Sequence, residues 1–500
     1  MDSIETPIAE KFTDATVSAD QQPGLPIFVD LDGTLARTDV AQELFIRYFK
    51  QPTRPFEFLT ALLSGPSHIK RILAETQDFS AETLPYNETI LNYLRTEKRK
   101  GRRVYLASAT DKLIAEKIAD HLQLFDGVIA SSPGENLKGS AKLDRIREQA
   151  AGEAFEYIGD SDADIPIWDS ATQCGFVNTK GKAASFATKV RNVSVSVADL
   201  PSRPRAVFKA IRPHQWAKNF LIFAPLLFSH SYTDPSQVMA TVLAFLAFSA
   251  CASAIYIVND LFDVEADRVH HKKKFRPFAA GTLQPIDGAL VAGVLITGAL
   301  IASASLLPFS FLLVLLAYIA TTTLYSTVLK HYSTIDVITL TCLYTVRLIA
   351  GAAAISVELS PWLLNFSLFF FLSLAYMKRY IELKAVEPGQ KLNGRNYSSD
   401  EVDIIAASGL VCGGLSILTL SLYLNSEYVK STYSSPTLLW LICPLLLFWV
   451  FRCWLWARRG KIDDDPVVFA LRDRISLTTA VITGSLIIAS KYVHLGGLLP

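Results

Sequence analysis

The sequence predicts two structural parts: a Rossmann-like α/β domain with a small helical cap, followed by an all-α membrane bundle of nine transmembrane helices. The 500 residues are 50% hydrophobic with a formal net charge of +1, but residues 1–200 mix charged and apolar residues while residues 219–496 consist mostly of long apolar runs. In the first part, short apolar strands alternate with helical stretches, which is typical of a parallel sheet. In the second part, nine apolar runs approach the roughly 20 residues that a spanning helix needs.

The chain ahead of the α/β domain is predicted to be a disordered leader over residues 1–24. These residues are polar and acidic, without the basic start and apolar core of a secretory signal. We expect the α/β domain over 25–195, a linker and interfacial segment over 196–216, and the membrane domain over 217–500. The six cysteines form no Cys-x-x-Cys pair, so neither a disulfide framework nor a zinc site is indicated.

The α/β domain is expected to begin with a buried strand over residues 26–31, which carries Asp30 and is followed at once by Asp32. Residues 40–100 are more helical and predict the cap. Ligands bind at the carboxyl ends of strands in open α/β sheets, so we expect the site there. Further strands are predicted at 104–107, 127–130, 156–158 and 175–177.

Polar side chains follow several of these strands. Ser108 ends one strand, and Asp160 and Asp164 follow another at a spacing of four, while Lys138 and Lys142 lie near the start of a helical run. One such residue alone is more typical of a helix cap. Taken in this order, with Asp30 and Asp32, they resemble the four motifs of the haloacid dehalogenase-like phosphatases.

That resemblance covers about residues 25–190 and implies a role for each matching position. Asp30 would be the nucleophile that forms an aspartyl-phosphate, and Asp32 the general acid and base. Ser108 and Lys142 would hold the phosphoryl oxygens, with Lys138 as the alternative lysine. A degenerate regulatory domain is the competing interpretation. Magnesium would be bound by the carboxylates of Asp30, Asp32, Asp160 and Asp164.

The membrane topology is predicted from the basic residues. The even-numbered loops between spans carry nearly all the lysines and arginines, so these loops and the α/β domain are expected in the cytoplasm of an integral protein of a bacterial inner membrane. Orientation and contact with anionic lipids alone are the alternative explanation for these charges. The predicted spans are 217–231, 237–258, 286–304, 309–329, 335–355, 361–378, 403–424, 437–455 and 474–494.

An acidic segment follows the second predicted span. Asn259, Asp260, Asp263 and Asp267 recur at intervals that place them toward one side of a helix continuing through the loop. Several acids at a membrane boundary repel one another unless a cation binds there, which predicts a metal site. With the basic residues that follow, the segment resembles the first polar loop of the UbiA-type prenyltransferases, in which magnesium holds a diphosphate. The basic residues predicted to contact phosphate oxygens there are Lys274 and Arg276.

The later loop, residues 376–384, lacks the second aspartate cluster found in much of that family. Together with runs 212–219 and 463–470, this loop resembles the decaprenyl-phosphate phosphoribosyltransferase branch, and the resemblance covers about residues 205–495. It implies phosphoribosyl pyrophosphate and a polyprenyl phosphate as substrates, with pyrophosphate released. Asn259 would join the magnesium-diphosphate site. The further cations expected to bind phosphates are Lys218, Lys378 and Arg379.

Three polar residues at or inside predicted spans, Tyr325, Asp336 and Arg347, are left with two interpretations: they face the substrate cavity, or they form structural interhelical pairs.

The two resemblances together imply consecutive reactions, because the transfer leaves a ribose 5-phosphate that the phosphatase would hydrolyse. The alternatives are a phosphatase for an unrelated small phosphate, an aromatic prenyltransferase that uses a prenyl diphosphate, and a transporter or lipid-binding scaffold with a regulatory domain. No nucleic-acid partner is expected, since the basic residues cluster at membrane loops. A homo-oligomer is left open.

Overall fold

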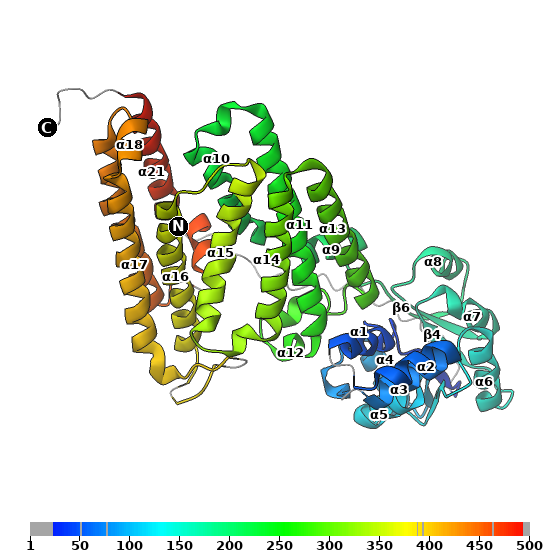
Figure 1. The fold of residues 1–500 in the computed structure, drawn as a ribbon. Helices are drawn as coiled ribbons and strands as arrows, with labels where there is room; N and C mark the ends of the chain where they lie inside the picture. Colours follow the sequence, from blue (N-terminus) through cyan, green and yellow to red (C-terminus); the bar gives the residue numbers. More distant parts are fainter. Residues whose placement is uncertain are drawn as a thin grey trace. The chain divides into compact units, whose positions relative to one another are not determined.

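A computed structural model of the protein describes residues 24–50, 53–76, 79–387, 389–392, 395–462 and 465–493 (Figure 1). The predicted leader lies outside the described residues except for Gly24. Within the described chain, one compact unit takes in the residues up to Ile211 together with Tyr256–Val291, and a second takes in Arg212–Ile255 and the residues from Ala292 onward.

The first unit contains a six-stranded parallel sheet with the strand order β3-β2-β1-β4-β5-β6. The predicted parallel sheet is therefore confirmed. The sixth strand was not predicted; it is a short edge strand of alternating Val and Ser residues. The strands are β1 (Ile27–Val29), β2 (Val104–Asp111), β3 (Gly127–Ser131), β4 (Glu156–Gly159), β5 (Gln173–Val177) and β6 (Val193–Val197).

Helices cover both faces of this sheet, because successive strand residues point to opposite sides. Ile27 and Val29 of β1 are buried in one apolar core, whereas Phe28 between them is buried in the other. The helices of the first unit outside the membrane-type segments are α1 (Val40–Lys50), α2 (Pro55–Ser64), α3 (Pro66–Thr76), α4 (Glu88–Arg99), α5 (Lys112–Leu122), α6 (Ser140–Ala150), α7 (Ile165–Ser170), α8 (Gly181–Ala187), α9 (Arg203–Ile211) and α12 (Val264–Val269).

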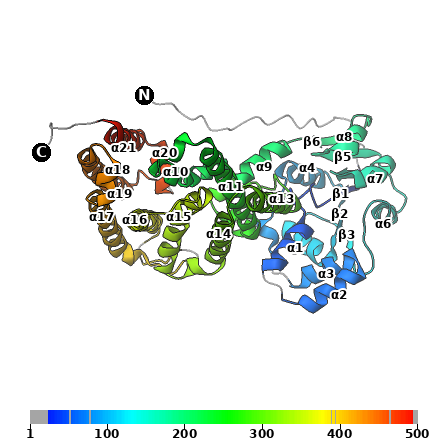
Figure 2. The same cartoon turned by 45° about the horizontal axis from the view of Figure 1, so that its top comes forward.

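The second unit is built from long helices, of which α14, α15, α16 and α17 lie side by side in chain order (Figures 1 and 2). It opens with a 3-10 helix, η3 (Pro213–Phe223). Two helices, α11 and α13, begin or end in the first unit. The remaining helices are α10 (Ala224–Phe228), α11 (Pro235–Phe262), α13 (Pro285–Leu306), α14 (Phe309–Thr327), α15 (Ile335–Ala354), α16 (Pro361–Lys384), α17 (Val402–Leu424), α18 (Glu427–Thr432), α19 (Ile442–Arg458), α20 (Pro466–Arg472) and α21 (Arg474–Tyr492).

Seven helices in the described part of the chain are long and apolar enough to cross a membrane, and they coincide with seven of the nine predicted spans. The predicted span 361–378 lies in α16, whose carboxyl-terminal turns carry several charges. The predicted span 217–231 is instead occupied by η3 and the short helix α10. The total of nine spans therefore stays a prediction.

Candidate functional sites

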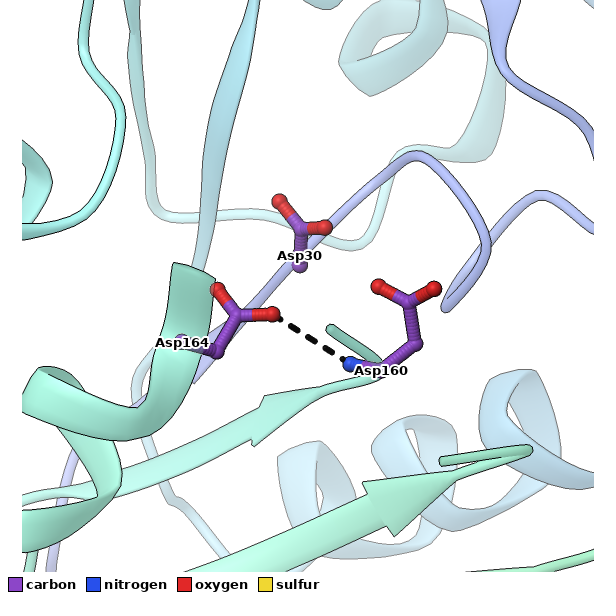
Figure 3. Close-up of side chains that lie close together, drawn as sticks. All are labelled: Asp30, Asp160 and Asp164. Carbon is purple, nitrogen blue, oxygen red and sulfur yellow. Dashed lines mark hydrogen bonds between the residues drawn. The ribbon is translucent and has the colours of Figure 1, made fainter. Parts of the chain in front are cut away.

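Three carboxylates meet at the carboxyl edge of the sheet (Figure 3). Asp30 follows β1 and Asp160 follows β4, and these strands are direct neighbours in the sheet. Asp164 lies in the short 3-10 helix Asp162–Asp164 that follows. One oxygen from each of the three carboxylates lies within 4.8 Å of the others. After β1 the next strand, β2, is added on one side of it, and after β4 the next strand, β5, is added on the opposite side. The carboxylate group therefore lies at the point where the strand order reverses, which is where α/β folds bind ligands.

A buried lysine completes this group. The Lys142 ammonium donates to the carboxylates of Asp30, at 2.8 Å, and of Asp164, at 3.3 Å. The Tyr157 hydroxyl accepts from Lys142 at 3.0 Å and donates to Asp164 at 2.6 Å. Lys142 lies in the first turn of α6, while Lys138 precedes that helix and is exposed. Of the two predicted lysines, Lys142 is the one that the structure places against Asp30.

The electrostatics of the group fit a divalent cation. Burial raises the pKa of Asp30 to about 6, against the opposing effect of Lys142, and burial with repulsion from Asp30 and Asp164 raises the pKa of Asp160 well above its usual value. Gly33 has φ 81°, a backbone conformation that favours glycine, and a Cβ there would meet the Asp160 carboxylate, which would have to move. Carboxylate oxygens are the ligands that Mg²⁺ prefers, and Asp30, Asp160 and Asp164 could hold it.

Asp32 has different surroundings. Its carboxylate accepts from the backbone N–H of Val40 at 2.8 Å and from the Thr110 hydroxyl at 2.5 Å. Burial, with repulsion from Asp39 and Asp30, raises its pKa to about 7, which suits a proton donor. Asp32 is outside the group of three close carboxylates, so the structure gathers three of the four predicted magnesium ligands.

Ser108, the predicted phosphate-binding hydroxyl, is buried within β2, where the register with β3 shifts after Ala107, and its oxygen accepts from the Thr110 N–H at 3.0 Å.

The acidic segment of residues 259–267 is arranged differently from the prediction. Helix α11 ends at Phe262 and α12 begins at Val264, so the helix does not continue unbroken past Asp263. Asp260 and Asp267 both accept from the Arg276 guanidinium, at 3.1 and 2.6 Å.

Asp263 pairs with Lys50 of α1 at 3.2 Å, so it is engaged apart from Asp260 and Asp267. Within the described residues these three aspartates do not form a close carboxylate group like that of Asp30. Lys274 is exposed beside the ring of Phe275. Asn259 lies in the last turn of α11 and is half-buried.

Two further ion pairs join this segment to α1 within the first unit. Glu43 and Arg268 form a buried pair at 2.5 Å, and Arg47 pairs with Glu265 at 2.5 Å. The acidic segment is thus held by the helix that follows the Asp30 loop.

In the second unit, two predicted phosphate ligands converge on one carboxylate. Lys218 of η3 lies 2.5 Å from Oδ2 of Asp465, and Lys378 of α16 lies 3.8 Å from the same oxygen. The other oxygen of Asp465 accepts from the backbone N–H of Val467 and caps α20. This cap fixes the carboxylate, which in turn holds the two ammonium groups at one place.

Arg379, the neighbouring predicted ligand, is fully buried in a different network. Its guanidinium pairs with Asp336 at 2.6 Å and with Glu382. Arg395 also pairs with Asp336 at 2.6 Å, and the Tyr325 hydroxyl donates to Asp336 at 2.8 Å. These contacts realise the structural pairing that was one of the two interpretations for Tyr325 and Asp336.

Arg347 is buried among aromatic rings. Its guanidinium lies over the rings of Phe248, Tyr318 and Tyr344, and its Nε donates to the Asn219 side chain at 2.9 Å. Asn219 directly follows Lys218, so this arginine is linked to the segment that carries the lysine pair.

An apolar cavity of about 770 Å³ lies in the second unit. Its lining comes from η3, α10, α16, α19, α20 and α21, and includes Leu221, Leu374 and Val467. Each of these three residues is within four positions of Lys218, Lys378 or Asp465. The segments that carry these three charged residues therefore also contribute apolar residues to the cavity wall, although none of the three charged residues lines the cavity itself.

Comparison with known proteins identifies both parts. Residues 220–472 match the model of the UbiA prenyltransferase family. The chain belongs to that family. Residues 66–168 match haloacid dehalogenase-like hydrolases, so a UbiA transferase region and a haloacid dehalogenase-like phosphatase domain share one chain. Both sequence resemblances are confirmed, and with its apolar helices the UbiA protein is an integral membrane protein.

Three relatives illustrate the match. The UbiA-family chain is 37% identical to the uncharacterized protein y4nM of Sinorhizobium fredii over 90% of its length and 88% of that protein. It is 31% identical to the nodulation protein NoeC of Azorhizobium caulinodans over 54% of its length and 88% of that protein. It is 40% identical to decaprenyl-phosphate phosphoribosyltransferase of Mycobacterium tuberculosis over 36% of its length and 61% of that enzyme.

Two residues of these sites were missed in the sequence. In the sequence, Tyr157 is indistinguishable from an ordinary core residue of β4. Nothing in the local sequence shows that its hydroxyl contacts Lys142. For Asp465 the sequence does contain an indication of a structural role, because an aspartate directly before proline is typical of a helix N-cap. That signal predicts the cap but not the lysine partners.

Proposed function

We propose that the UbiA region transfers 5-phosphoribose from phosphoribosyl pyrophosphate to a polyprenyl phosphate and that the phosphatase domain then removes the 5-phosphate. The product would be a polyprenyl-phosphoryl ribose. The α/β domain and the basic loops would face the cytoplasm of a bacterial inner membrane.

The observation that carries the proposal is the lysine pair Lys218 and Lys378, which meets at Asp465 and lies on segments that also line the apolar cavity. A polyprenyl phosphate has one anionic end and a long apolar chain, and these features match two ammonium groups and an apolar cavity. The relative named decaprenyl-phosphate phosphoribosyltransferase supports the same acceptor.

In the transfer, an oxygen of the lipid phosphate would attack the anomeric carbon of ribose while the bond from that carbon to pyrophosphate breaks. Asn259, Asp260, Asp263 and Asp267 would hold the diphosphate through Mg²⁺, which would neutralise charge on the leaving group. Binding there would need Asp260 and Asp267 to exchange Arg276 for the metal. Arg276 and Lys274 would then be free to contact phosphate oxygens, and Arg379 would do so only after giving up its present partners.

In the dephosphorylation, an oxygen of Asp30 would attack phosphorus while the bond from phosphorus to the ribose oxygen breaks. Asp32 would give its proton to that oxygen and later take one from the water that hydrolyses the aspartyl-phosphate. Lys142 and Ser108 would hold the phosphoryl oxygens. Mg²⁺ on Asp30, Asp160 and Asp164 would offset the negative charge of the phosphoryl group.

The test uses the full chain in nanodiscs with Mg²⁺, radiolabelled phosphoribosyl pyrophosphate and decaprenyl phosphate. Wild type should form ribosyl lipid, and Asp30→Asn should accumulate phosphoribosyl lipid. Asp162→Asn is the matched control, because Asp162 is exposed in the same acidic loop and only caps α8 through Ala183. Absence of lipid-linked label in every sample would refute the transfer. Ribosyl lipid lacking the 5-phosphate from Asp30→Asn would refute the coupling to this phosphatase.

A further inference from the structure

Helices α1 and α2, which lie in the range predicted as the cap of the phosphatase domain, carry an exposed apolar surface. Phe56 and Leu63 of α2 are 83% and 86% exposed, although both are large apolar side chains. We name the cap patch as the set Phe49, Phe56, Leu59, Leu62 and Leu63, which are all more than half exposed.

The patch lies mainly on one face of α2. Phe56, Leu59 and Leu63 are spaced three and four residues apart, which places them on one face of α2. The opposite face packs inward through Ala61 and through Phe58, whose ring stacks on Tyr48 of α1. Phe49 of α1 lies edge-on to the ring of Phe58, with the ring centroids 6.4 Å apart, so this exposed ring lies next to the inward-packed side of α2. Helix α2 is therefore apolar on both faces, and packing against its own domain buries only one of these faces.

The lipid bilayer is the occupant that fits this surface. The compact unit that contains the cap also contains the ends of α11 and α13, two of the helices suited to cross a membrane. Helix α2 has ten residues, which is too short to span a bilayer but suits a helix lying in its interface. Arg54 at its start is exposed and supplies a polar edge. Exposed apolar patches of this kind mark membrane or protein contacts.

The patch is linked to the phosphatase site through the neighbouring helix α3. Only Gly65 separates α2 from α3, and Lys70 of α3 donates to the backbone oxygen of Ala109 at 2.6 Å. Ala109 follows Ser108, the predicted phosphate-binding hydroxyl. If α2 is inserted in the lipid interface, α3 and the phosphatase site next to it would therefore lie at the level of the lipid headgroups.

We propose that the cap patch inserts into the lipid interface and that the phosphatase site acts on phosphate monoesters carried by membrane lipids. The identity of that lipid as a phosphoribosyl polyprenyl phosphate rests on the proposed function. The insertion itself rests only on the exposed apolar surface and its place in the fold.

The first experiment measures insertion in the full chain in nanodiscs made with brominated phosphatidylcholine. After subtraction of the wild-type signal, the tryptophan fluorescence of Leu63→Trp should be quenched by the brominated lipid. Glu148→Trp is the matched control, because Glu148 is 70% exposed on α6 on the other side of the sheet and its tryptophan should stay unquenched. Equal fluorescence of Leu63→Trp in brominated and ordinary lipid would overturn the proposal.

The second experiment compares two substrates with the double variant Phe56→Ser, Leu63→Ser. Hydrolysis of phosphoribosyl lipid should fall about tenfold, because apolar area is lost from the lipid contact, while hydrolysis of soluble ribose 5-phosphate should be unchanged. The soluble substrate also reports that the variant is folded, and the single variant Leu63→Ser serves if the double variant is not. A wild-type rate on phosphoribosyl lipid in a variant that keeps its activity on ribose 5-phosphate would contradict the proposal. If the protein forms no phosphoribosyl lipid, the proposed function is refuted. The quenching measurement needs no transferase activity, so it still tests insertion in that case.

Discussion

The Lys142 ammonium lies 2.8 Å from the Asp30 carboxylate, although 112 positions separate them in the sequence. Asp164 holds the same ammonium from the other side, so Lys142 is fixed by two carboxylates and the Tyr157 hydroxyl. A cation in this place orients the predicted nucleophile and would face the phosphoryl group attached to it.

Lys142→Met is expected to lower phosphatase turnover by about 10²–10³-fold, because it removes the buried cation that would stabilise the phosphoryl oxygens. Phosphate release from a soluble phosphate monoester is the measurement. Lys138→Met is the matched control: Lys138 is exposed four residues earlier and its loss should leave turnover nearly unchanged. A larger loss in Lys138→Met than in Lys142→Met would reverse the assignment.

Removal of divalent cations with EDTA should abolish phosphatase activity, and added Mg²⁺ should restore it. Asp160→Asn should raise the Mg²⁺ concentration needed for half-maximal activity by at least about tenfold, because it removes one of the three close carboxylates. Asp162→Asn should respond to Mg²⁺ as wild type does. Full activity in EDTA would contradict a magnesium site.

Arg102→Met should destabilise the α/β domain by roughly 3–5 kcal/mol, because it removes the cation that Glu97 and Glu156 share and leaves Glu97 with Lys100 and Glu156 with the Tyr93 hydroxyl. Arg102 pairs with Glu97 at 2.9 Å and with Glu156 at 2.6 Å, and all three side chains are buried. The loss of phosphatase activity with increasing urea measures the change. Arg103→Met removes an exposed pair with Glu153 and should cost less than about 1 kcal/mol. Similar urea midpoints for the two variants would show that the buried group contributes no more than a surface pair.

Gly351→Ala should damage the membrane domain. A Cβ at Gly351 would collide with the backbone carbonyl of Ile222 in η3, so the segment that carries Lys218 would have to move. We expect a cost of about 1–3 kcal/mol and a lower transferase rate. Gly414 in α17 has open space around its Cβ position, so Gly414→Ala should be neutral or slightly stabilising. Thermal aggregation in detergent and transferase rates provide the comparison, and equal behaviour of the two variants would disprove the close packing.

Asp465→Asn should strengthen inhibition of the transferase by inorganic phosphate about tenfold, because it removes the carboxylate that partly neutralises Lys218 and Lys378. Asparagine can keep the cap of α20, so the fold is preserved. Asp473→Asn is the matched control, because Asp473 also caps a helix but its ion-pair partner is Arg452 and not the two lysines. Inhibition by phosphate should be unchanged in this control. An unchanged inhibition constant in Asp465→Asn would show that the two lysines bind no phosphate.

Much of the fold and part of the chemistry could be predicted from the sequence because the signals are local. The order of strands and helices, the two acidic motifs and seven of the spans follow from periodicity, composition and short spacings. The segment at residues 217–231 was predicted as a span but forms η3 and α10, because an apolar run does not show whether the backbone forms a long α-helix or a 3-10 helix followed by a short α-helix.

Only the tertiary structure decided which charged side chains meet. Its contacts place Lys142 rather than Lys138 on Asp30, join Lys218 and Lys378 through Asp465, and bury Arg379 against Asp336. These partners lie up to 247 positions apart. Each pairing depends on the packing of separate segments, because the energy of an ion pair is set by distance and burial and neither is visible in a linear sequence.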